Sequence, residues 1–379
     1  MSSLQSLSKG HKGHKGHKGH KGHKGHDEGS DDSDSGLLTE ALTASRDGIV
    51  GNWKGAVGTP AQLALESKEN MRLWAPEWRA DVVDAEIFSR IVFTVPQLDS
   101  KSPPMVTDHY FRVWHLVFST SGPTSTSLHE FARIRRPEVA QFVAQLELVA
   151  NYADLRNDRA AEVLAQIGGA EDFFASIAFL DPDKCRWTME LLGAAYRLAG
   201  FVVMRAKHAL ACRRPIDYSP QIQPMISTPS HSSYPSGHAT EAFAMALMLI
   251  RLLQAAPNPV YHHELYAVQL MRLAARVAIN RQVAGVHFPV DSACGAMLGM
   301  TLAEYLHARC TNGGPFTGWS FSGEMYADSA DFDWNRRFDT ANGVQVENDA
   351  ATKLKTSTSM GEGSKILEWL WCQALAEWK

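Results

Sequence analysis

The chain has 379 residues, of which 45% are apolar, so it is long enough to bury a sizeable core in one large domain or two small ones. Its net charge of -4 gives no indication of a nucleic-acid partner. The five cysteines are odd in number and widely spaced, which excludes a disulfide framework and a CxxC metal site, and we expect reduced, mostly buried thiols. No signal peptide and no apolar run of membrane-spanning length is seen, so we expect a soluble, cytoplasmic protein.

Residues 1–36 have a low-complexity sequence in which a Gly-His-Lys repeat precedes an acidic stretch, and we expect them to be disordered. The histidines of the repeat could bind a divalent metal such as zinc, nickel or copper. They are His11, His14, His17, His20, His23 and His26. We favour a solvated tail over a metal site, because a flexible set of ligands must be ordered before it can bind.

From residue 37 onward the apolar residues recur at helical spacing, and no convincing alternating strand is seen. The first clear helix follows Pro137, which suits the first turn of a helix. Further helices are predicted over residues 186–211, 237–254, 264–283, 289–308 and 365–379, and residues 311–363 are expected to be an irregular connection. The sequence therefore predicts an all-α fold in which the helices form a bundle.

Three short segments combine cations, histidines and a carboxylate. They are Lys-x6-Arg-Pro from Lys207, Pro-Ser-Gly-His at 235–238, and Arg-x5-His-x3-Asp from Arg281. Each alone is a weak signal, because a lone cation is usually solvated and a lone histidine is usually a satisfied core residue. Lys207 and Arg281 each follow a strongly apolar helical segment, however, where a cation costs free energy unless it is paired. Together with Arg214 they predict a bound anion that carries several oxygens.

The residues around these cations supply the other parts of a catalytic site. Ser236 and Gly237 fall at the start of a predicted helix, where free backbone amides and the helix dipole favour an anion. His238 can move a proton near neutral pH. Asp291 can hold the imidazole of His287 and fix its tautomer, either on one helical face or across the start of a helix.

In this order, the three motifs resemble the signature of the superfamily that joins vanadium-dependent haloperoxidases to type 2 phosphatidic acid phosphatases (PAP2) and class A acid phosphatases. The resemblance covers about residues 187–308, a third of the chain. Asn280 stands where the family usually has a serine, and the segment between Arg214 and Ser236 is short for an algal or fungal peroxidase. With the resemblance, the chain divides into a tail (1–36), an N-terminal helical region (37–185), a catalytic core (186–310) and a loop-rich C-terminal region that ends in a helix (311–379).

The resemblance implies a role for each motif residue. His238 would be the acid–base, and Asp291 would orient His287. His287 would be the axial ligand of vanadium in a peroxidase, or the nucleophile toward phosphorus in a phosphatase. The oxygens of vanadate or phosphate would be held by Lys207, Arg214, Ser236, the Gly237 amide and Arg281, with Lys207 also acting in catalysis by polarising a bound oxygen.

Between the two reactions, we favour a haloperoxidase that holds vanadate and oxidises bromide with hydrogen peroxide before an organic acceptor is halogenated. The absence of membrane spans and of a signal peptide favours it, and so does the length of chain before Lys207. His231 lies five residues before Ser236. Bromide-oxidising peroxidases resemble this chain at that position, because they also have a second histidine there. A polar loop histidine explains His231 equally well.

The alternative is a phosphatase that hydrolyses phosphate esters through a phosphohistidine and needs no cofactor. The short segment before Ser236 and the Ala-Gly-Val-His-Phe-Pro stretch at 284–289 favour it. A second alternative is a non-enzymatic protein that sequesters metal with its histidine-rich tail. The complete set of motif residues argues against this alternative. The resemblance also suggests a homo-oligomer, because large bundles of this superfamily are often dimers.

Overall fold

The computed structural model describes residues 32–101, 105–119, 125–314, 316–358 and 363–379. The histidines of the N-terminal repeat, which we considered as metal ligands, lie outside these ranges. Within them, no group of three or more histidine, cysteine, aspartate or glutamate side chains could hold a metal ion.

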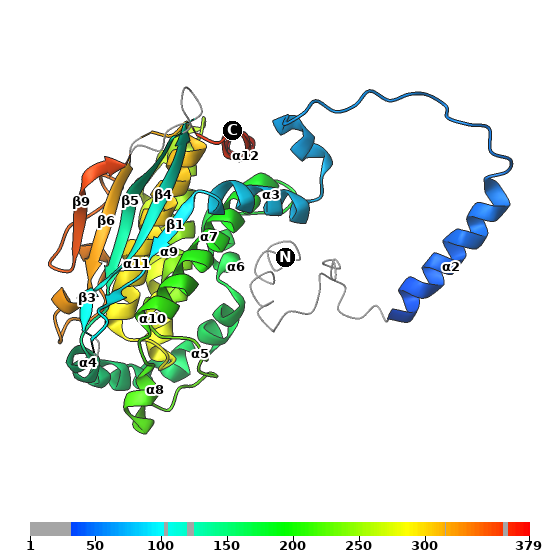
Figure 1. Ribbon diagram of the computed structural model, residues 1–379. Coiled ribbons are helices and arrows are strands. Elements are labelled where there is room, and N and C mark those ends of the chain that lie inside the picture. The colour runs from blue at the N-terminus through cyan, green and yellow to red at the C-terminus, as the bar shows by residue number, and fades with distance from the viewer. Residues whose placement is uncertain (1–31, 102–104, 120–124, 315, 359–362) are drawn as a thin grey trace.

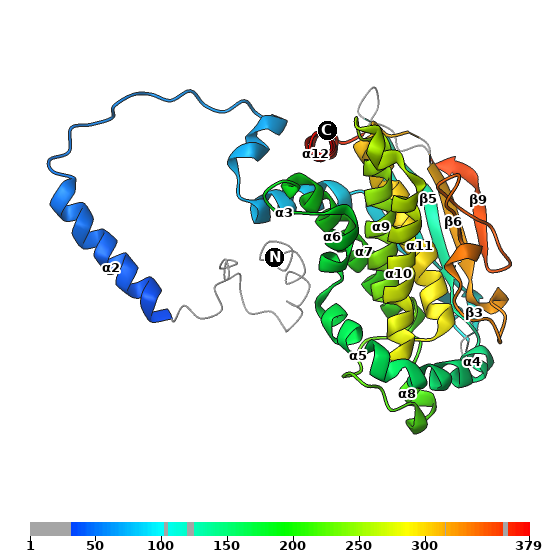
Figure 2. The same cartoon turned by 180° about the vertical axis from the view of Figure 1, so that it is seen from behind.

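The described part of the chain begins with a lone helix. α2 (Asp32–Ile49) starts inside the segment 1–36 that we expected to be disordered, and its residues from Gly36 onward are exposed. In Figures 1 and 2, α2 stands apart from the other helices, joined to them by an extended stretch. The packed body therefore starts later, near η1 (Lys68–Leu73), where Met71 is buried.

Four long helices form the centre of the molecule (Figure 1). They are α7 (Arg186–Leu210), α9 (Gly237–Ala255), α10 (Glu264–Val283) and α11 (Pro289–Cys310). Their bounds agree with the predicted helices to within two residues, so the predicted helical bundle is confirmed. α9 and α11 are buried on nearly all sides because they are apolar on nearly all sides.

Two glycines allow α9 and α11 to pack backbone against backbone. A Cβ built on Gly299 would lie 2.3 Å from the carbonyl oxygen of Thr240, and one on Gly295 would lie 2.7 Å from that of Ser236. These distances are too short for any real side-chain atom, so the approach requires glycine. It holds the start of α9 against α11.

A five-stranded sheet covers one side of the bundle, with the strand order β1-β4-β5-β6-β9 (Figure 1). The strands are β1 (Ile91–Thr94), β4 (Tyr110–Ser119), β5 (Ser125–Arg135), β6 (Phe316–Ser322) and β9 (Ala351–Thr358). β5 and β6 are parallel, and the other neighbouring pairs are antiparallel. Two small ribbons pair β2 (Gln97–Leu98) with β3 (Val106–Asp108) and β7 (Phe338–Asp339) with β8 (Val344–Gln345).

The expectation that the chain contains no strands was therefore wrong, as was that of an irregular connection over 311–363. In β4, Phe111, Val113 and His115 are buried, but Trp114 on the opposite face is also large and apolar, so the alternation of polar and apolar residues is obscured. The register with β5 also shifts after Val113. In β5, Phe131 stacks on Tyr305 of α11 with ring centroids 4.6 Å apart, which fixes the sheet on the bundle.

Helices from the N-terminal region cover the bundle on the side away from the sheet, except α4, which lies at the end of the molecule below the sheet (Figure 2). They are α3 (Pro76–Phe88), α4 (Val139–Asn151), α5 (Arg156–Ala165) and α6 (Glu171–Ala178), with η2 (Tyr152–Leu155) and η3 (Gln166–Gly168) between them. α4 follows Pro137 as predicted. Glu162 of α5 forms an ion pair with Arg276 of α10, which places η3 beside the last turns of α10.

The C-terminal helix α12 (Lys365–Leu375) ends four residues before the predicted helix did and packs on α7. Just beyond it, the carboxylate of Glu377 accepts hydrogen bonds of 2.9 Å from the backbone amides of Trp187 and Thr188 and so caps α7. The remaining short elements are α8 (Pro215–Tyr218), η4 (Pro220–Ile222), η5 (Pro259–His262), η6 (Gly323–Met325) and η7 (Trp334–Arg336).

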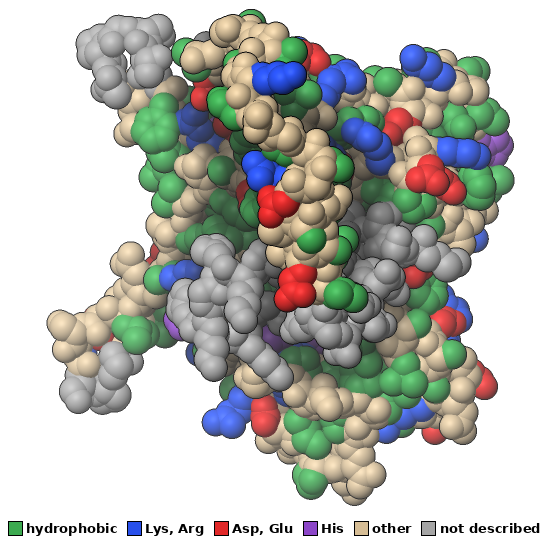
Figure 3. Space-filling view, turned by 90° about the vertical axis from the view of Figure 1, so that its right-hand side faces the viewer, with side chains coloured by type: hydrophobic (Ala, Val, Ile, Leu, Met, Phe, Trp, Pro, Cys, Tyr) green, Lys and Arg blue, Asp and Glu red, His purple; other side chains and the backbone are tan. Residues whose placement is uncertain are grey.

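Across the described ranges, no helix has both the length and the apolar character needed to cross a membrane. On the face shown in Figure 3, lysine and arginine side chains are interspersed with aspartate and glutamate. No large area of one charge is visible there, in keeping with the small net charge.

We expect Gly299→Ala to destabilise the protein by about 1–3 kcal/mol or more, because the added methyl group would overlap the backbone of α9, which cannot move away without disturbing the start of that helix. Gly48→Ala, on exposed α2 with no atom within 4 Å of the added Cβ, is the matched control. Urea unfolding of both variants measures the effect. Equal unfolding midpoints for the two variants would contradict the close packing of α9 and α11.

Candidate active site

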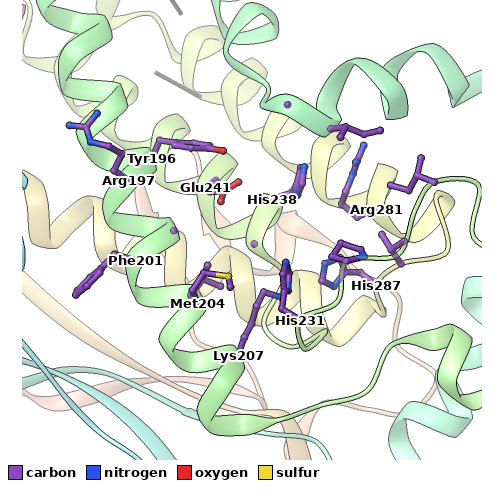
Figure 4. Close-up of a pocket in the computed structure, with 18 of the residues that line it drawn as sticks. Tyr196, Arg197, Phe201, Met204, Lys207, His231, His238, Glu241, Arg281 and His287 are labelled. Atoms are coloured by element: carbon purple, nitrogen blue, oxygen red, sulfur yellow. The ribbon is translucent and has the colours of Figure 1, made fainter. Parts of the chain in front are cut away.

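A cavity of about 580 Å³ lies between α7, α9 and α10 and the loops that precede α9 and α11. Seven of the predicted site residues line it: Lys207, Arg214, His231, Gly237, His238, Arg281 and His287. Figure 4 shows the labelled members of this set gathered at one end of the cavity, with Tyr196, Arg197 and Phe201 toward the other. The structure therefore brings the three sequence motifs to one place.

His287 is positioned from behind by Asp291. The two residues do not share a helical face: Phe288 is the N-cap of α11, and Asp291 is the third residue of that helix, so the pair spans the helix start. The Asp291 carboxylate lies 2.8 Å from Nδ1 of His287 and also accepts hydrogen bonds from the Phe288 amide and the Ser233 hydroxyl. Since a carboxylate accepts, Nδ1 carries the proton and the lone pair of Nε2 faces the cavity.

Burial and the nearby charges of Arg214 and Lys207 hold the pKa of His287 well below its usual value, so its imidazole is neutral. Burial raises the pKa of Asp291 to about 6, while the hydrogen bonds from Ser233 and Phe288 oppose that shift. A neutral imidazole with a free Nε2 is the form that can bond to phosphorus or to a metal.

Arg214 is held by the two loops that flank the site. Its Nη1 donates to the carbonyl of Val286 at 2.7 Å and to Nε2 of His287 at 3.0 Å. Its Nε donates to the carbonyl of His231 at 3.1 Å. The guanidinium is thus fixed beside Nε2 of His287. An entering oxyanion would replace Nε2 as the acceptor of the hydrogen bond from Nη1.

Lys207 lies at the end of α7 and is almost fully buried. Its Nζ donates to the carbonyls of Ser232 and Ser233 at 2.9 and 2.6 Å, which uses two of the three protons of an ammonium group. Burial first, and then the charge of Arg214, lower the pKa of Lys207 well below its usual value. The third proton remains for a bound anion.

Arg281 contributes donors that have no acceptor. Its Nη2 donates to the carbonyl of Val163 at 2.9 Å, but Nε and Nη1 are buried and find no hydrogen-bond partner among the described residues. Burial lowers the pKa of this guanidinium to about 10, so it stays charged at neutral pH. Unpaired buried N–H groups are costly, and a multi-oxygen anion in the cavity would satisfy them.

No carboxylate of the described chain lies within 4.0 Å of a side-chain nitrogen of Lys207, Arg214 or Arg281. Backbone carbonyls hold all three instead. Carbonyl dipoles orient a cation without cancelling its charge, so the site keeps a net positive charge for an anion.

The start of α9 adds backbone amides to the site. Ser236 is the N-cap, and its hydroxyl accepts a hydrogen bond from the Ala239 amide. The hydroxyl is fully buried and does not line the cavity, so Ser236 is the one predicted oxyanion ligand that the structure does not bring there. The amides of Gly237 and His238, in contrast, have no earlier helical carbonyl to bond and are free to bind an anion.

His238 is oriented by a residue that the sequence did not reveal. Its Nε2 lies 3.0 Å from the backbone carbonyl of Gln166, so Nε2 carries the proton and Nδ1 is the free nitrogen. Burial, with the charge of Arg281, lowers the pKa of His238 to about 3. A bound anion would raise that pKa again, which couples anion binding to protonation of His238.

His231, the candidate halide-site residue, also lines the cavity. Its Nδ1 lies 3.2 Å from Nη2 of Arg214, and burial lowers its pKa to about 4. His231 is thus an exposed loop histidine whose ring contacts Arg214 at the edge of the cavity.

Two further side chains were missed. Gln166 accepts hydrogen bonds from Asn280 and Arg281 through its side chain, and no local pattern marks it, because it approaches from η3 over a long sequence separation. Glu241 lines the cavity one helical turn after Gly237, and helical spacing could have identified it. Asn280, in the family's serine position, donates hydrogen bonds to Glu162 and Gln166.

Comparison with known proteins places the site in a family. The model of the PAP2 superfamily matches residues 189–311. The chain is 33% identical to the vanadium-dependent bromoperoxidase of Ascophyllum nodosum over 94 residues, which cover 20% of this chain and 17% of that protein. It is 34% identical to the decaprenylphosphoryl-5-phosphoribose phosphatase of Mycobacterium tuberculosis over 110 residues, which cover 29% of this chain and 54% of that protein.

A solved structure, that of a transmembrane PAP2 type phosphatidylglycerolphosphate phosphatase from Bacillus subtilis, is 20% identical with a TM-score of 0.37, covering 44% of this chain and 85% of that one. The chain spans about half the length of the M. tuberculosis phosphatase and less than a fifth of the bromoperoxidase. The cations, both histidines of the motifs and Asp291 fall within the range that the family model matches. Residues 189–311 of this chain are therefore a PAP2 superfamily domain, the domain that phosphatases and vanadium-dependent bromoperoxidases share.

Proposed function

We propose that this chain is a phosphatase that hydrolyses phosphate monoesters through a phosphohistidine at His287. The form of the cavity is the observation that carries the proposal. Cations and helix amides gather at one end, and Phe201 lies toward the other end with Tyr196 and Arg197. The cavity lining also includes the apolar side chains of Phe88, Ile167 and Met204. A phosphoryl group at the cationic end would leave an organic group in the apolar part, whereas peroxide and halide are too small to need that space.

This proposal reverses the order of preference that the sequence alone suggested. The match to the bromoperoxidase covers 17% of that protein, whereas matches to the phosphatases of M. tuberculosis and Mycolicibacterium smegmatis cover 54% and 59% of theirs. The short segment between Arg214 and Ser236 also supports a phosphatase.

His287 supplies the nucleophile in this mechanism. The bound phosphoryl anion keeps His238 in its doubly protonated form. Nε2 of His287 attacks phosphorus, an N–P bond forms, and the P–O bond to the leaving group breaks while the departing oxygen takes the Nδ1 proton of His238, which becomes neutral. In the second step a water molecule gives a proton to His238, its oxygen attacks phosphorus, and the N–P bond breaks. Phosphate leaves, and both histidines return to their starting state.

The cations stabilise the charge that develops on the phosphoryl oxygens. Lys207, Arg214 and Arg281 are already anchored by carbonyls before substrate enters, so little reorganisation is needed at the transition state. The free amides of Gly237 and His238 add donors with fixed directions. A site of this kind binds the five-coordinate transition state more strongly than the substrate.

A second candidate function, vanadate-dependent bromide oxidation, is favoured by one observation: His231 contacts Arg214 at the anion site. The residues fit vanadate, because Arg281 has two buried N–H groups without acceptors and His287 presents an unprotonated Nε2, which now accepts a hydrogen bond from Arg214. Vanadate would be held by Lys207, Arg214, Arg281 and the Gly237 amide, with His287 as its protein ligand. When bound, it would supply the Lewis-acidic centre that activates hydrogen peroxide toward halide.

Two assays on the purified protein decide between these functions. Hydrolysis of p-nitrophenyl phosphate that orthovanadate inhibits, with only trace bromination of a phenol-type dye, would support the phosphatase. Bromination with peroxide and bromide that depends on added orthovanadate, without ester hydrolysis, would refute it in favour of the peroxidase.

We expect His287→Ala to lower phosphatase turnover by on the order of 10³-fold or more, because it removes the atom that bonds to phosphorus. Alkaline quenching after exposure to labelled substrate should trap a phosphohistidine in the wild type and none in the variant. His109→Ala, at an exposed position, is the control and should keep both turnover and label. Label retained in the His287 variant would disprove the assigned nucleophile.

His238→Ala should slow alkyl phosphates by about 10²–10⁴-fold, because their leaving group needs a proton. p-Nitrophenyl phosphate should be affected far less, since nitrophenolate leaves without one. The ratio of kcat/KM for the two substrates, variant against wild type, measures the effect. An equal loss for both substrates would mean that His238 is not the acid.

His231→Phe separates the two candidate functions. It should change phosphatase kcat less than tenfold, because His231 supports Arg214 and takes no part in proton transfer. If the vanadate-loaded protein brominates, the same variant should shift its preference between bromide and chloride. An unchanged halide preference would mean that His231 only supports Arg214 and does not contact the halide.

A further inference from the structure

The cavity contains a carboxyl group that the proposed mechanism does not use. Glu241 of α9 lines the cavity together with the cations of the anion site. A carboxylate in a site that binds an anion is unexpected, because like charges disfavour each other strongly where water is excluded.

The geometry places this carboxyl beside the anion donors. Glu241 follows Gly237 by four residues on α9, so both lie on the same face of the helix. A Cβ built on Gly237 would be 3.9 Å from Oε1 of Glu241 and 3.9 Å from Cε of Lys207. The carboxyl group therefore lies next to the free amide of Gly237 and to the Lys207 side chain, and Figure 4 shows it between Tyr196 and His238.

No ion pair holds Glu241 in its charged form. The charged and titratable groups around it are Lys207 and Tyr196 of α7, Glu171 of α6, His238 of α9 and Arg281 of α10. None of the cations lies within 4.0 Å of its oxygens among the described residues. Lys207 directs its ammonium to the carbonyls of Ser232 and Ser233 instead.

Burial raises the pKa of Glu241 to about 7, with a smaller contribution from the charge of Glu171 and an opposing one from Lys207. A bound dianion beside the carboxyl would raise that pKa further. The protonated form also offers an O–H donor toward the anion, which the ionised form lacks.

We propose that Glu241 is a specificity-determining residue of the anion site: its carboxyl must carry a proton when a doubly charged oxyanion is bound. This inference rests on the oxyanion site of the proposed function and adds to it. Below the pKa of Glu241 the carboxyl is already neutral and anions bind freely. Above that pKa each dianion must bring a proton with it, so the affinity falls as pH rises.

The test is the binding of molybdate to full-length protein by isothermal titration calorimetry at about pH 5.5 and about pH 8.5. Molybdate stays doubly charged over this range, so the ligand itself does not titrate. Glu241→Gln keeps the size of the side chain and mimics the protonated carboxyl. Glu264→Gln, at the exposed start of α10, removes the same charge from the surface and is the control.

We expect wild type and Glu241→Gln to bind molybdate equally at the lower pH. At the higher pH a carboxyl with a pKa near 7 is protonated in about 3% of molecules, so the variant should bind about thirtyfold more tightly than wild type. Titration in buffers of different ionisation enthalpy should show wild type taking up one proton more per molybdate than the variant. The charge of Glu241 also raises the pKa of Lys207, so the variant carries less Lys207 ammonium at the higher pH and the measured ratio is a lower limit for the effect of Glu241.

The proposal would be overturned if the molybdate affinities of Glu241→Gln and wild type differed by less than twofold at both pH values. Glu241→Met, also uncharged and similar in size, has the same expected result and replaces the glutamine variant if that variant does not fold. Molybdate is not hydrolysed, so the outcome is independent of turnover. If the affinity ratio is as expected but the protein hydrolyses no phosphate ester, the role of Glu241 is supported and the phosphatase function is refuted. If the wild type binds no molybdate, both proposals are refuted.

Discussion

The site depends on one constraint: three buried cations must be held in place without being neutralised. Lys207, Arg214 and Arg281 are each anchored by a backbone carbonyl, and no described carboxylate lies within ion-pairing distance of them. Asp291, the one carboxylate that is fixed close by, is bonded to His287 and to helix-start donors instead. We propose that the free energy of burying this unpaired charge is recovered when an oxyanion enters the cavity.

The carbonyls that hold these cations come from segments far apart in the chain. Ser233 belongs to the loop before α9 and Val286 to the loop before α11, and both loops are set by the close packing of α9 on α11 at Gly295 and Gly299. Val163 belongs to α5, outside the matched PAP2 range. The N-terminal region is thus part of the anion site and not only a covering, because without it Arg281 and His238 would lose the acceptors that orient them.

Proton positions follow from the same arrangement. Burial makes His287 and His238 neutral in the absence of an anion, so each imidazole has one unprotonated nitrogen; in the proposed mechanism that of His287 is the nucleophile and that of His238 accepts a proton when the anion binds. An incoming anion changes that balance, because its negative charge favours protonation of every group around it. Substrate binding and the protonation state needed for catalysis are therefore coupled through charge alone.

The sequence by itself determined the helical bundle and selected residues that the structure brings together at one cavity. Helical spacing is a local property, so α7, α9, α10 and α11 could be read from it to within two residues, and motif spacing was enough to select Lys207, Arg214, His238, Arg281, His287 and Asp291. Tertiary structure alone decided the five-stranded sheet, whose strands join residues 91–135 to 316–358 and carry apolar side chains on both faces. It also decided that Ser236 caps α9 instead of lining the cavity, that Gln166 orients His238, and that Glu241 lies beside the cations. The contact of His238 with Gln166 joins residues 72 apart in the sequence, so no local pattern encodes it. Ser236 and Glu241 lie within one turn of Gly237, but whether each faces the cavity depends on how α9 packs against the other helices.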